Sequence, residues 1–203
     1  LTLPAVPGQI AEWCVKNGYG VKTLVNNAGF GLWGAFLNLS LSEQLNMMQL
    51  NMSSLVALTH HLIPLLQKNR PSHILNVASV ASYIAIPNFS IYAATKAFVL
   101  SFSRSLRMEL SKSGVSVSCV CPGATESEFL ERAGMEALGK KAGSVNMTAQ
   151  AVASVSIKGM LRGKAEIIPG FINKVAANSI KLIPRELMEA VAGKIYAKRD
   201  KGL

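Results

Sequence analysis

The chain has 203 residues, half of which are hydrophobic, and carries a formal net charge of +10 at pH 7. A chain of this length and apolar content can bury one substantial core, so we expect a single domain over residues 1–203. No apolar run reaches the roughly 18 residues that cross a bilayer, and the first residues show no signal-peptide pattern, which predicts a soluble, cytoplasmic protein.

The first predicted elements are a helix, a strand and a second helix. Apolar residues at helical spacing predict a helix over residues 7–17, and the β-branched run at residues 21–26 suits a buried strand. Ser40 and Glu43 have the spacing of a capping box, which predicts the start of a long helix that ends before Pro71. A loop therefore separates the first strand from this helix.

The same alternation continues to the C-terminus. We expect strands at 73–77, 115–121 and 165–169, helices over 91–113 and from the N-cap Thr148 to Arg162, and two further helices divided by Pro184. Apolar strands that alternate with helices predict an α/β fold with three layers, in which a doubly wound parallel sheet is covered by helices on both faces.

The cysteines and histidines give no sign of a disulfide framework or a metal site. Cys14, Cys119 and Cys121 form neither an even set nor a C-x-x-C pair, so we expect reduced, buried thiols. The histidines have no acidic or cysteine cluster at metal-ligand spacing, so we predict no metal site.

Tyr92 and Lys96 are four residues apart in a predicted helix and therefore lie on one face of it. A phenol with a reference pKa of about 10 needs help to exchange protons at neutral pH, and a nearby ammonium group lowers that pKa. Such a pair more often lies on a helix surface without a function than in an active site, so the neighbouring residues decide the interpretation.

Three further features lie around this pair. Ser79 follows a predicted strand, at the carboxyl edge where open α/β sheets bind ligands. The segment "NNAG" (26–29) closes the preceding strand with small residues that let a flat ligand approach the backbone. Asn51 is a polar residue inside an apolar helix and needs partners if it faces inward. Asn51 as a structural helix residue and Ser79 as a loop hydroxyl stay open as alternatives.

In this order, "NNAG", Asn51, Ser79, Tyr-x-x-x-Lys and the "PG" at Pro122 resemble the short-chain dehydrogenase/reductase family over nearly the whole chain. The resemblance implies a Rossmann-like NAD(P)-binding domain in which Tyr92 exchanges the proton at the substrate oxygen while Ser79 holds that oxygen. Lys96 would lower the tyrosine pKa and bind the nicotinamide ribose, and Asn51 would hold a water of the proton relay.

The resemblance also implies a cofactor site. Its residues would be Asn26, Ala28, Gly29, Tyr92, Lys96, Pro122, Gly123, Thr125 and Ser127, where Ser127 replaces the threonine common in the family. The subgroup it implies is that of bacterial ketone and aldehyde reductases, which mostly use NADP(H), so we expect NADP(H) rather than NAD(H).

The family's own glycine-rich turn belongs to strands that would precede Leu1, and we expect a β-α-β-α-β segment there. The motif G-x-G-x-x-G does occur at Gly29, Gly31 and Gly34, but the predicted helix starts only after Ser40. Because the fingerprint needs a helix that opens at its third glycine, we expect a substrate-side loop here.

The remaining predictions concern substrate and partners. A substrate pocket is predicted at Phe30 and Phe89, with Leu32, Trp33, Ile84 and Ile86 as further apolar candidates, although core packing explains these residues equally well. Helices 41–69 and 91–113 are apolar on more than one face, which predicts a homo-oligomer, a dimer or a tetramer.

The C-terminal residues 165–203 combine a strand with a basic helical tail near the substrate mouth. Residues 158–203 contain 10 Lys and Arg against 4 Asp and Glu. The tail is predicted to act as a lid or packing helix, with weak contact to an anionic membrane surface as the alternative. A catalytically silent NAD(P)-binding protein and a basic nucleic-acid-binding module are the rival functions, and the second lacks any motif for nucleic acid.

Overall fold

A computed structural model describes residues 1–135, 147–180, 183 and 187–190 of the chain. The strands are β1 (Thr23–Asn26), β2 (Ser72–Val77), β3 (Val115–Val120), β4 (Thr125–Glu126), β5 (Met147–Thr148) and β6 (Glu166–Ile167). The helices are α1 (Val6–Lys16), α2 (Leu41–Met48), α3 (Leu55–Lys68), α4 (Ser90–Glu109), α5 (Phe129–Arg132), α7 (Ala149–Leu161) and α8 (Phe171–Ile180). A π-helical turn, η1 (Gln49–Ser54), joins α2 to α3, and a 3₁₀ turn, η2 (Val80–Tyr83), follows β2.

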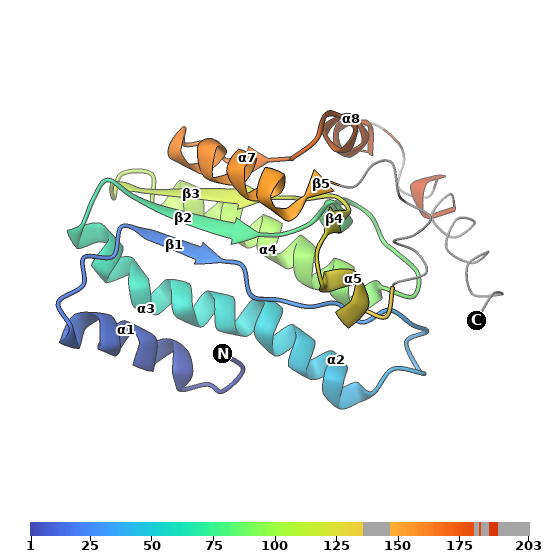
Figure 1. Cartoon of the computed structure of the whole chain (residues 1–203), viewed down its shortest axis with the longest axis horizontal. Coiled ribbons are helices and arrows are strands. Elements are labelled where there is room, and N and C mark those ends of the chain that lie inside the picture. Colours follow the sequence, from blue (N-terminus) through green and yellow to red (C-terminus); the bar gives the residue numbers. More distant parts are fainter. Residues whose placement is uncertain (136–146, 181–182, 184–186, 191–203) are drawn as a thin grey trace.

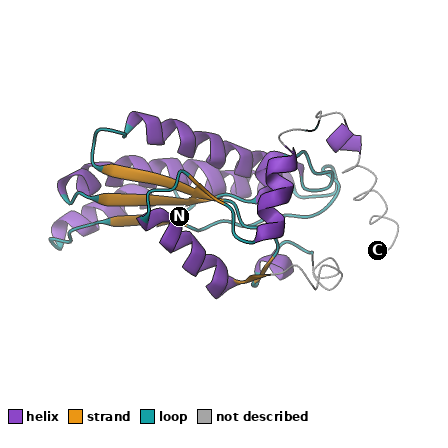
Figure 2. Ribbon diagram, turned by 90° about the horizontal axis from the view of Figure 1, so that it is seen from above, coloured by secondary structure: helices purple, strands orange, loops and turns teal. Residues whose placement is uncertain are grey.

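Four strands form a parallel sheet in the order β1-β2-β3-β6 (Figure 1). Helices cover both faces of this sheet, as Figure 2 shows from above. The α/β fold class and the parallel sheet are therefore confirmed. That further strands precede β1 stays a prediction.

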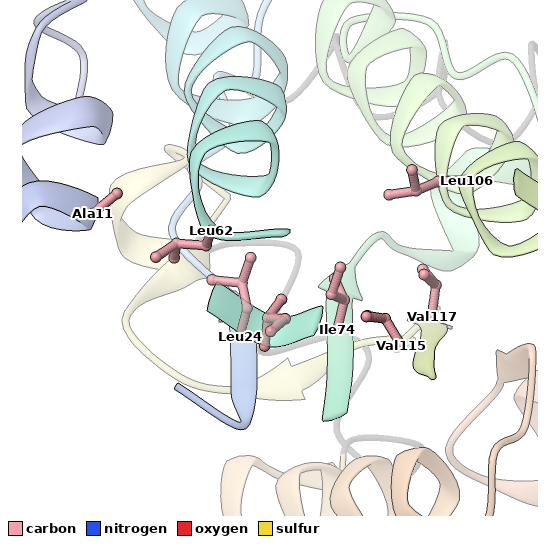
Figure 3. Close-up of a cluster of buried hydrophobic side chains, with 8 residues drawn as sticks. Ala11, Leu24, Leu62, Ile74, Leu106, Val115 and Val117 are labelled. Atoms are coloured by element: carbon pink, nitrogen blue, oxygen red, sulfur yellow. The ribbon is translucent and has the colours of Figure 1, made fainter. Parts of the chain in front are cut away.

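The two faces of the sheet have different cores, because side chains alternate along each strand. Ile74 and Val117 face α1, α3 and α4 and pack with Leu62 and Leu106 (Figure 3). Leu75 and Val120, on the same two strands, face the other way and pack on Met160 of α7. Strands buried on both sides explain why their sequences read as continuous apolar runs.

Of the two helix caps that the sequence predicted, one is confirmed and the other is wrong. Thr148 is the N-cap of α7, and its hydroxyl accepts a hydrogen bond from Ala151 N at 3.2 Å, as expected. Ser40 occupies the N-cap position of α2, but its side chain makes no capping bond and its hydroxyl instead pairs with that of Ser42 at 2.8 Å. The predicted capping box at Ser40 is therefore wrong.

Two predicted helices differ from the observed ones in extent. The long helix after Ser40 is interrupted by the π-helical turn η1. The helix predicted over 91–113 ends at Glu109, since Ser113 binds Leu110 O and Gly114 turns the chain with a φ of +79°. The predicted helix beyond Pro184 falls largely outside the described residues.

No helix in the described part of the chain is long and apolar enough to cross a bilayer.

Candidate active site

The carboxyl ends of β1, β2 and β3 bring three loops to one edge of the sheet. Ser79 lies just after β2, and Pro122 and Gly123 just after β3. The loops after β2 and β3 are joined by a backbone hydrogen bond of 2.9 Å from Val80 N to Pro122 O. Parallel pairing thus places residues from distant parts of the sequence side by side.

Ser79 is held by the 3₁₀ turn that follows it. Its backbone is extended and forms the N-cap of η2, and its Oγ accepts a hydrogen bond from Ala81 N at 3.1 Å. The hydroxyl proton is then the part of this side chain that can be donated to another oxygen.

Tyr92 lies near the start of α4, with 6% of its surface exposed. Its ring stacks on Phe89 with a centroid distance of 4.2 Å and contacts Phe129 at 5.3 Å. Burial raises the pKa of Tyr92 to about 12, while a hydrogen bond with Ser79 lowers it. The phenol therefore carries its proton at neutral pH, next to the serine that the sequence pairs with it.

Lys96 lies one helical turn after Tyr92 and is also buried. Its Nζ donates a hydrogen bond to Val77 O at 2.9 Å and lies 5.6 Å from the centroid of the Tyr92 ring. Burial lowers the pKa of Lys96 to about 8, against a smaller raising effect of the Cys119 and Cys121 thiols. Within the described residues it makes no ion pair, so two of its ammonium protons remain for a ligand.

Asn51 lies in the π-helical turn, the kind of irregular turn that often marks functional sites. Its Nδ2 donates to Phe30 O at 3.0 Å and to Thr95 Oγ1 at 3.1 Å, and its Oδ1 accepts from Phe30 N at 3.2 Å. Both amide protons are engaged, so the side chain fixes the loop after β1 against α4. That Asn51 holds a water of the proton relay stays a prediction. Such a water would have to bind to the backbone of Asn51 or to the free lone pair of its Oδ1.

Asn26 has a similar role at the end of β1. Its Nδ2 donates to Thr59 Oγ1 at 2.9 Å and to Asn76 Oδ1 at 2.8 Å, and Asn76 in turn donates to Ser103 Oγ at 2.9 Å. These buried bonds tie β1, β2, α3 and α4 together. Both amide protons of Asn26 are therefore engaged, and its contact with a cofactor stays a prediction.

The segment after Asn26 leaves an open approach to the site. Ala28 is exposed and Gly29 is half-buried. A methyl group at Gly29 would lie 2.8 Å from Asn51 Oδ1 and 3.5 Å from Lys96 Nζ. The missing side chain thus lets the backbone at Gly29 lie close to Asn51 and Lys96. Helix α2 begins at Leu41, so Gly34 opens no helix, as expected of a loop without a phosphate role.

The loop after β3 is the other side of the site. Thr125 Oγ1 donates to Gly123 O at 3.0 Å, and Ser127 Oγ accepts from Phe129 N at 3.4 Å. A methyl group at Gly123 would lie 2.5 Å from both side-chain polar atoms of Asn173, which belongs to α8. Helix α8 therefore packs directly against this loop, and the role of the C-terminal segment as a lid or packing helix stays a prediction.

An apolar wall surrounds Tyr92. The predicted pocket residues all belong to one cluster with it, namely Phe30, Leu32, Trp33, Ile84, Ile86 and Phe89. Phe129 and Met135 join the same cluster. The arrangement brings a proton donor, a serine hydroxyl and a cation to one edge beside an apolar surface.

Sequence reasoning missed several residues of the site. Thr95 donates to Tyr92 O at 2.8 Å and accepts from Asn51, and it could have been suspected from its place between Tyr92 and Lys96. Asn76 is a polar residue in a buried strand, which is also a readable signal. Phe129 and Asn173 carry no such signal. Among the described residues, no group of three or more potential ligands could bind a metal ion.

Comparison with known proteins agrees with this geometry. A family model described as short chain dehydrogenase matches residues 6–138. Nodulation protein G of Rhizobium meliloti (strain 1021) is 34% identical over 125 residues, which cover 62% of this chain and 50% of that protein. A sulfoacetaldehyde reductase of Chromohalobacter salexigens is 37% identical over 139 residues, which cover 66% of this chain and 55% of that protein. The chain thus spans about half the length of these curated relatives.

Solved structures share the fold over most of the chain. A short-chain dehydrogenase from Sphingobium yanoikuyae in complex with NADPH has a TM-score of 0.75 and 27% identity, and the match covers 91% of this chain and 73% of that one. A short chain dehydrogenase/reductase from Burkholderia phymatum in complex with NAD has a TM-score of 0.78 and 20% identity, over 87% of this chain and 71% of that one.

Proposed function

Because this chain belongs to the short-chain dehydrogenase family, we propose that the protein interconverts a ketone or aldehyde and its alcohol with a nicotinamide cofactor. The observation that carries the proposal is the position of Tyr92, which is buried beneath the Lys96 ammonium group and whose pKa the nearby Ser79 side chain acts to lower. When bound, the cofactor supplies or accepts the hydride.

Tyr92 acts as the general acid of carbonyl reduction. Its pKa of about 12 keeps the phenol protonated, so a proton is available for the carbonyl oxygen as charge develops there. In alcohol oxidation Tyr92 has to work as a base, and the hydrogen bond with Ser79 favours this by lowering its pKa. Ser79 donates its hydroxyl proton to the same substrate oxygen and fixes its position.

Lys96 has two roles in the proposal. Its ammonium group lies 5.6 Å from the Tyr92 ring and stabilises the phenolate form electrostatically. Its remaining protons face the space that Gly29 leaves open, where they would bind ribose hydroxyls. Asn51 and Thr95 hold the loop and the helix that define this space.

The substrate is proposed to be small or lipophilic, since the side chains around Tyr92 are aromatic and aliphatic. We propose NADP(H) as the preferred cofactor on the strength of the sequence subgroup, although proteins of the same fold are known in complex with NADPH and with NAD. The whole protein is proposed to be a single cytoplasmic NAD(P)-binding domain.

The decisive experiment is a panel of ketones and aldehydes assayed with the intact protein and with NADPH or NADH consumption as the readout. Turnover of an apolar carbonyl compound with NADPH preferred supports the proposal. Cofactor binding without turnover of any compound favours the catalytically silent alternative. Binding of a DNA oligonucleotide that weakens with salt, without cofactor binding, favours the nucleic-acid module.

Assembly also remains a proposal. On the helix predicted over residues 41–69, which was expected to contribute to a homo-oligomer, Met47, Leu62 and Leu66 are buried inside the chain. On α4, however, Phe98 and Met108 are 40% and 71% exposed and provide apolar surface for a second copy. Sedimentation velocity that shows a monomer at micromolar concentration would exclude it. Weak contact of the tail with anionic lipid stays a prediction, and most of the tail lies outside the described residues.

A further inference from the structure

Tyr83 closes the 3₁₀ turn that Ser79 opens. Its phenol donates a hydrogen bond of 2.8 Å to Oε1 of Glu166 in β6. The other carboxylate oxygen of Glu166 pairs with Arg104 of α4. The last residue of the turn is thus tied to a strand and a helix outside the loop.

The same turn is anchored at its beginning. Val80 N donates to Pro122 O at 2.9 Å, and Ala78 N donates to Val120 O at 2.8 Å. Cys121 lies between these two acceptors in the sequence, and its thiol contributes to the raised pKa of the Tyr83 phenol. The start of the turn is therefore fixed to the carboxyl end of β3, and its last residue, Tyr83, is fixed to β6.

The direction of the Ser79 hydroxyl depends on the geometry of this turn. Ser79 Oγ accepts from Ala81 N at 3.1 Å, and Ser82 N donates to Ser79 O at 3.0 Å. Ala81 and Ser82 lie between the two anchors. If the Tyr83 end is released, the amide that orients Ser79 Oγ is free to shift.

We propose that Tyr83 is a positioning residue for Ser79, acting through its hydrogen bond to Glu166. This inference rests on the proposed function for its catalytic consequence. Tyr83 touches neither Tyr92 nor the reacting oxygen in this assignment. It keeps the serine hydroxyl at the distance and angle that the reaction needs, where small displacements reduce the rate.

The test compares Tyr83→Phe with variants matched to it. Tyr83→Phe removes the hydroxyl and leaves the ring. Glu166→Gln keeps an oxygen acceptor for Tyr83, whereas Glu166→Leu removes it. Tyr19→Phe removes an exposed phenol hydroxyl far along the sequence and serves as the control.

Steady-state kinetics give the first readout. Tyr83→Phe and Glu166→Leu are expected to lower kcat about 5- to 10-fold with KM for the cofactor unchanged, which corresponds to the loss of about one hydrogen bond. Glu166→Gln should keep kcat within about twofold of the parent value, and Tyr19→Phe should not change it. Equal kcat in Tyr83→Phe and the parent would overturn the proposal.

Hydrogen exchange of the Val80, Ala81 and Ser82 amides gives a second readout that needs no turnover. Exchange should become faster in Tyr83→Phe and Glu166→Leu and stay slow in Glu166→Gln and Tyr19→Phe. Unchanged exchange in Tyr83→Phe would overturn the proposed positioning role of Tyr83 even if the parent enzyme is active. If the parent protein reduces no carbonyl compound, the proposed function fails, while the exchange data still support or overturn the effect of Tyr83 on the turn.

Discussion

Tyr83 and Tyr92 lie close together in the sequence and present the same phenol to very different surroundings. Burial raises the pKa of Tyr83, and Cys121 and Glu166 raise it further. Burial also raises the pKa of Tyr92, but the hydrogen bond with Ser79 acts in the opposite direction. Cys121 and Glu166 thus favour the neutral phenol of Tyr83, whereas Ser79 favours the anion of Tyr92.

The difference matches the two roles that we propose for the two tyrosines. Tyr83 donates its proton to a carboxylate that has a cation behind it, which is the arrangement of a structural hydrogen bond. Tyr92 lies beneath a lysine that has no acidic partner among the described residues. These surroundings fit the proposed general-acid role of Tyr92 and the proposed positioning role of Tyr83.

The largest expected effect comes from removing the Tyr92 hydroxyl. Tyr92→Phe should lower kcat by about 10²- to 10⁴-fold, which is the usual contribution of a general acid, and leave cofactor affinity unchanged. Carbonyl reduction and cofactor titration by fluorescence measure the two quantities. Tyr83→Phe is the matched comparison with an expected loss of only about 5- to 10-fold. A reversed order of the two losses would show that the roles of the tyrosines have been exchanged.

The second effect concerns Lys96 and the pH dependence of stability. Its pKa is about 8 in the folded chain, against 10.5 for the ordinary side chain. Between these values the unfolded chain binds more protons, so the free energy of unfolding should rise with pH, by about 3 kcal/mol in total. Above this range the raised pKa of Tyr92 acts in the opposite direction, since the unfolded chain loses its phenol proton first.

Lys96→Met should abolish this rise and be more stable than the parent protein below about pH 8. Urea unfolding at about pH 7 and about pH 10 measures the change. Lys16→Met, at an exposed position on α1, is the control for the general loss of positive charge. The same Lys96 variant should bind the cofactor more weakly, so a more stable but inactive protein is the expected combination. A parent-like pH dependence in Lys96→Met would contradict the assignment.

The sequence predicts these two regions to different extents, because their interacting residues lie at different distances along the chain. Tyr92 and Lys96 are neighbours on one helix, and Ser79 follows a strand whose end had to meet them, so local patterns were sufficient. The bond from Tyr83 to Glu166 joins residues 83 positions apart. Nothing local in either segment signals this pairing, which appears only when β6 is placed beside β3.

The same reasoning explains the other successes and failures. Thr148 caps α7 because its amide partner is three residues away. Ser40 has the same local pattern, but a second hydroxyl, that of Ser42, competes for its side chain. The π-helical turn at Asn51 follows from tertiary bonds to Phe30 and Thr95, and helix-period patterns do not encode it.

A third, smaller effect tests whether cofactor binding depends on the absence of a side chain at Gly29. Gly29→Ala places a methyl group 2.8 Å from Asn51 Oδ1, an atom that is already hydrogen-bonded. We expect cofactor affinity to fall about tenfold, because the loop must move out of the space in front of Lys96. Gly8→Ala is the control, since its methyl group would lie at an ordinary 3.6 Å from His61. Equal cofactor affinity in the two variants, measured by titration, would place the cofactor elsewhere.

The smallest effect is expected at the outer end of the Tyr83 network. The Arg104 side chain is 53% exposed, whereas that of Glu166 is 14% exposed. Exposed ion pairs contribute about 0–1 kcal/mol, because water screens the charges and the long side chain loses freedom. Arg104→Gln should therefore change the free energy of unfolding by less than about 1 kcal/mol and leave kcat almost unchanged. Urea unfolding and kinetics at low and high salt measure both. Arg104→Gln could instead lower kcat as far as Tyr83→Phe does. The position of Ser79 would then depend on the charge of Glu166 and not on the hydrogen bond from Tyr83. In that case the difference between the two tyrosines would be electrostatic only.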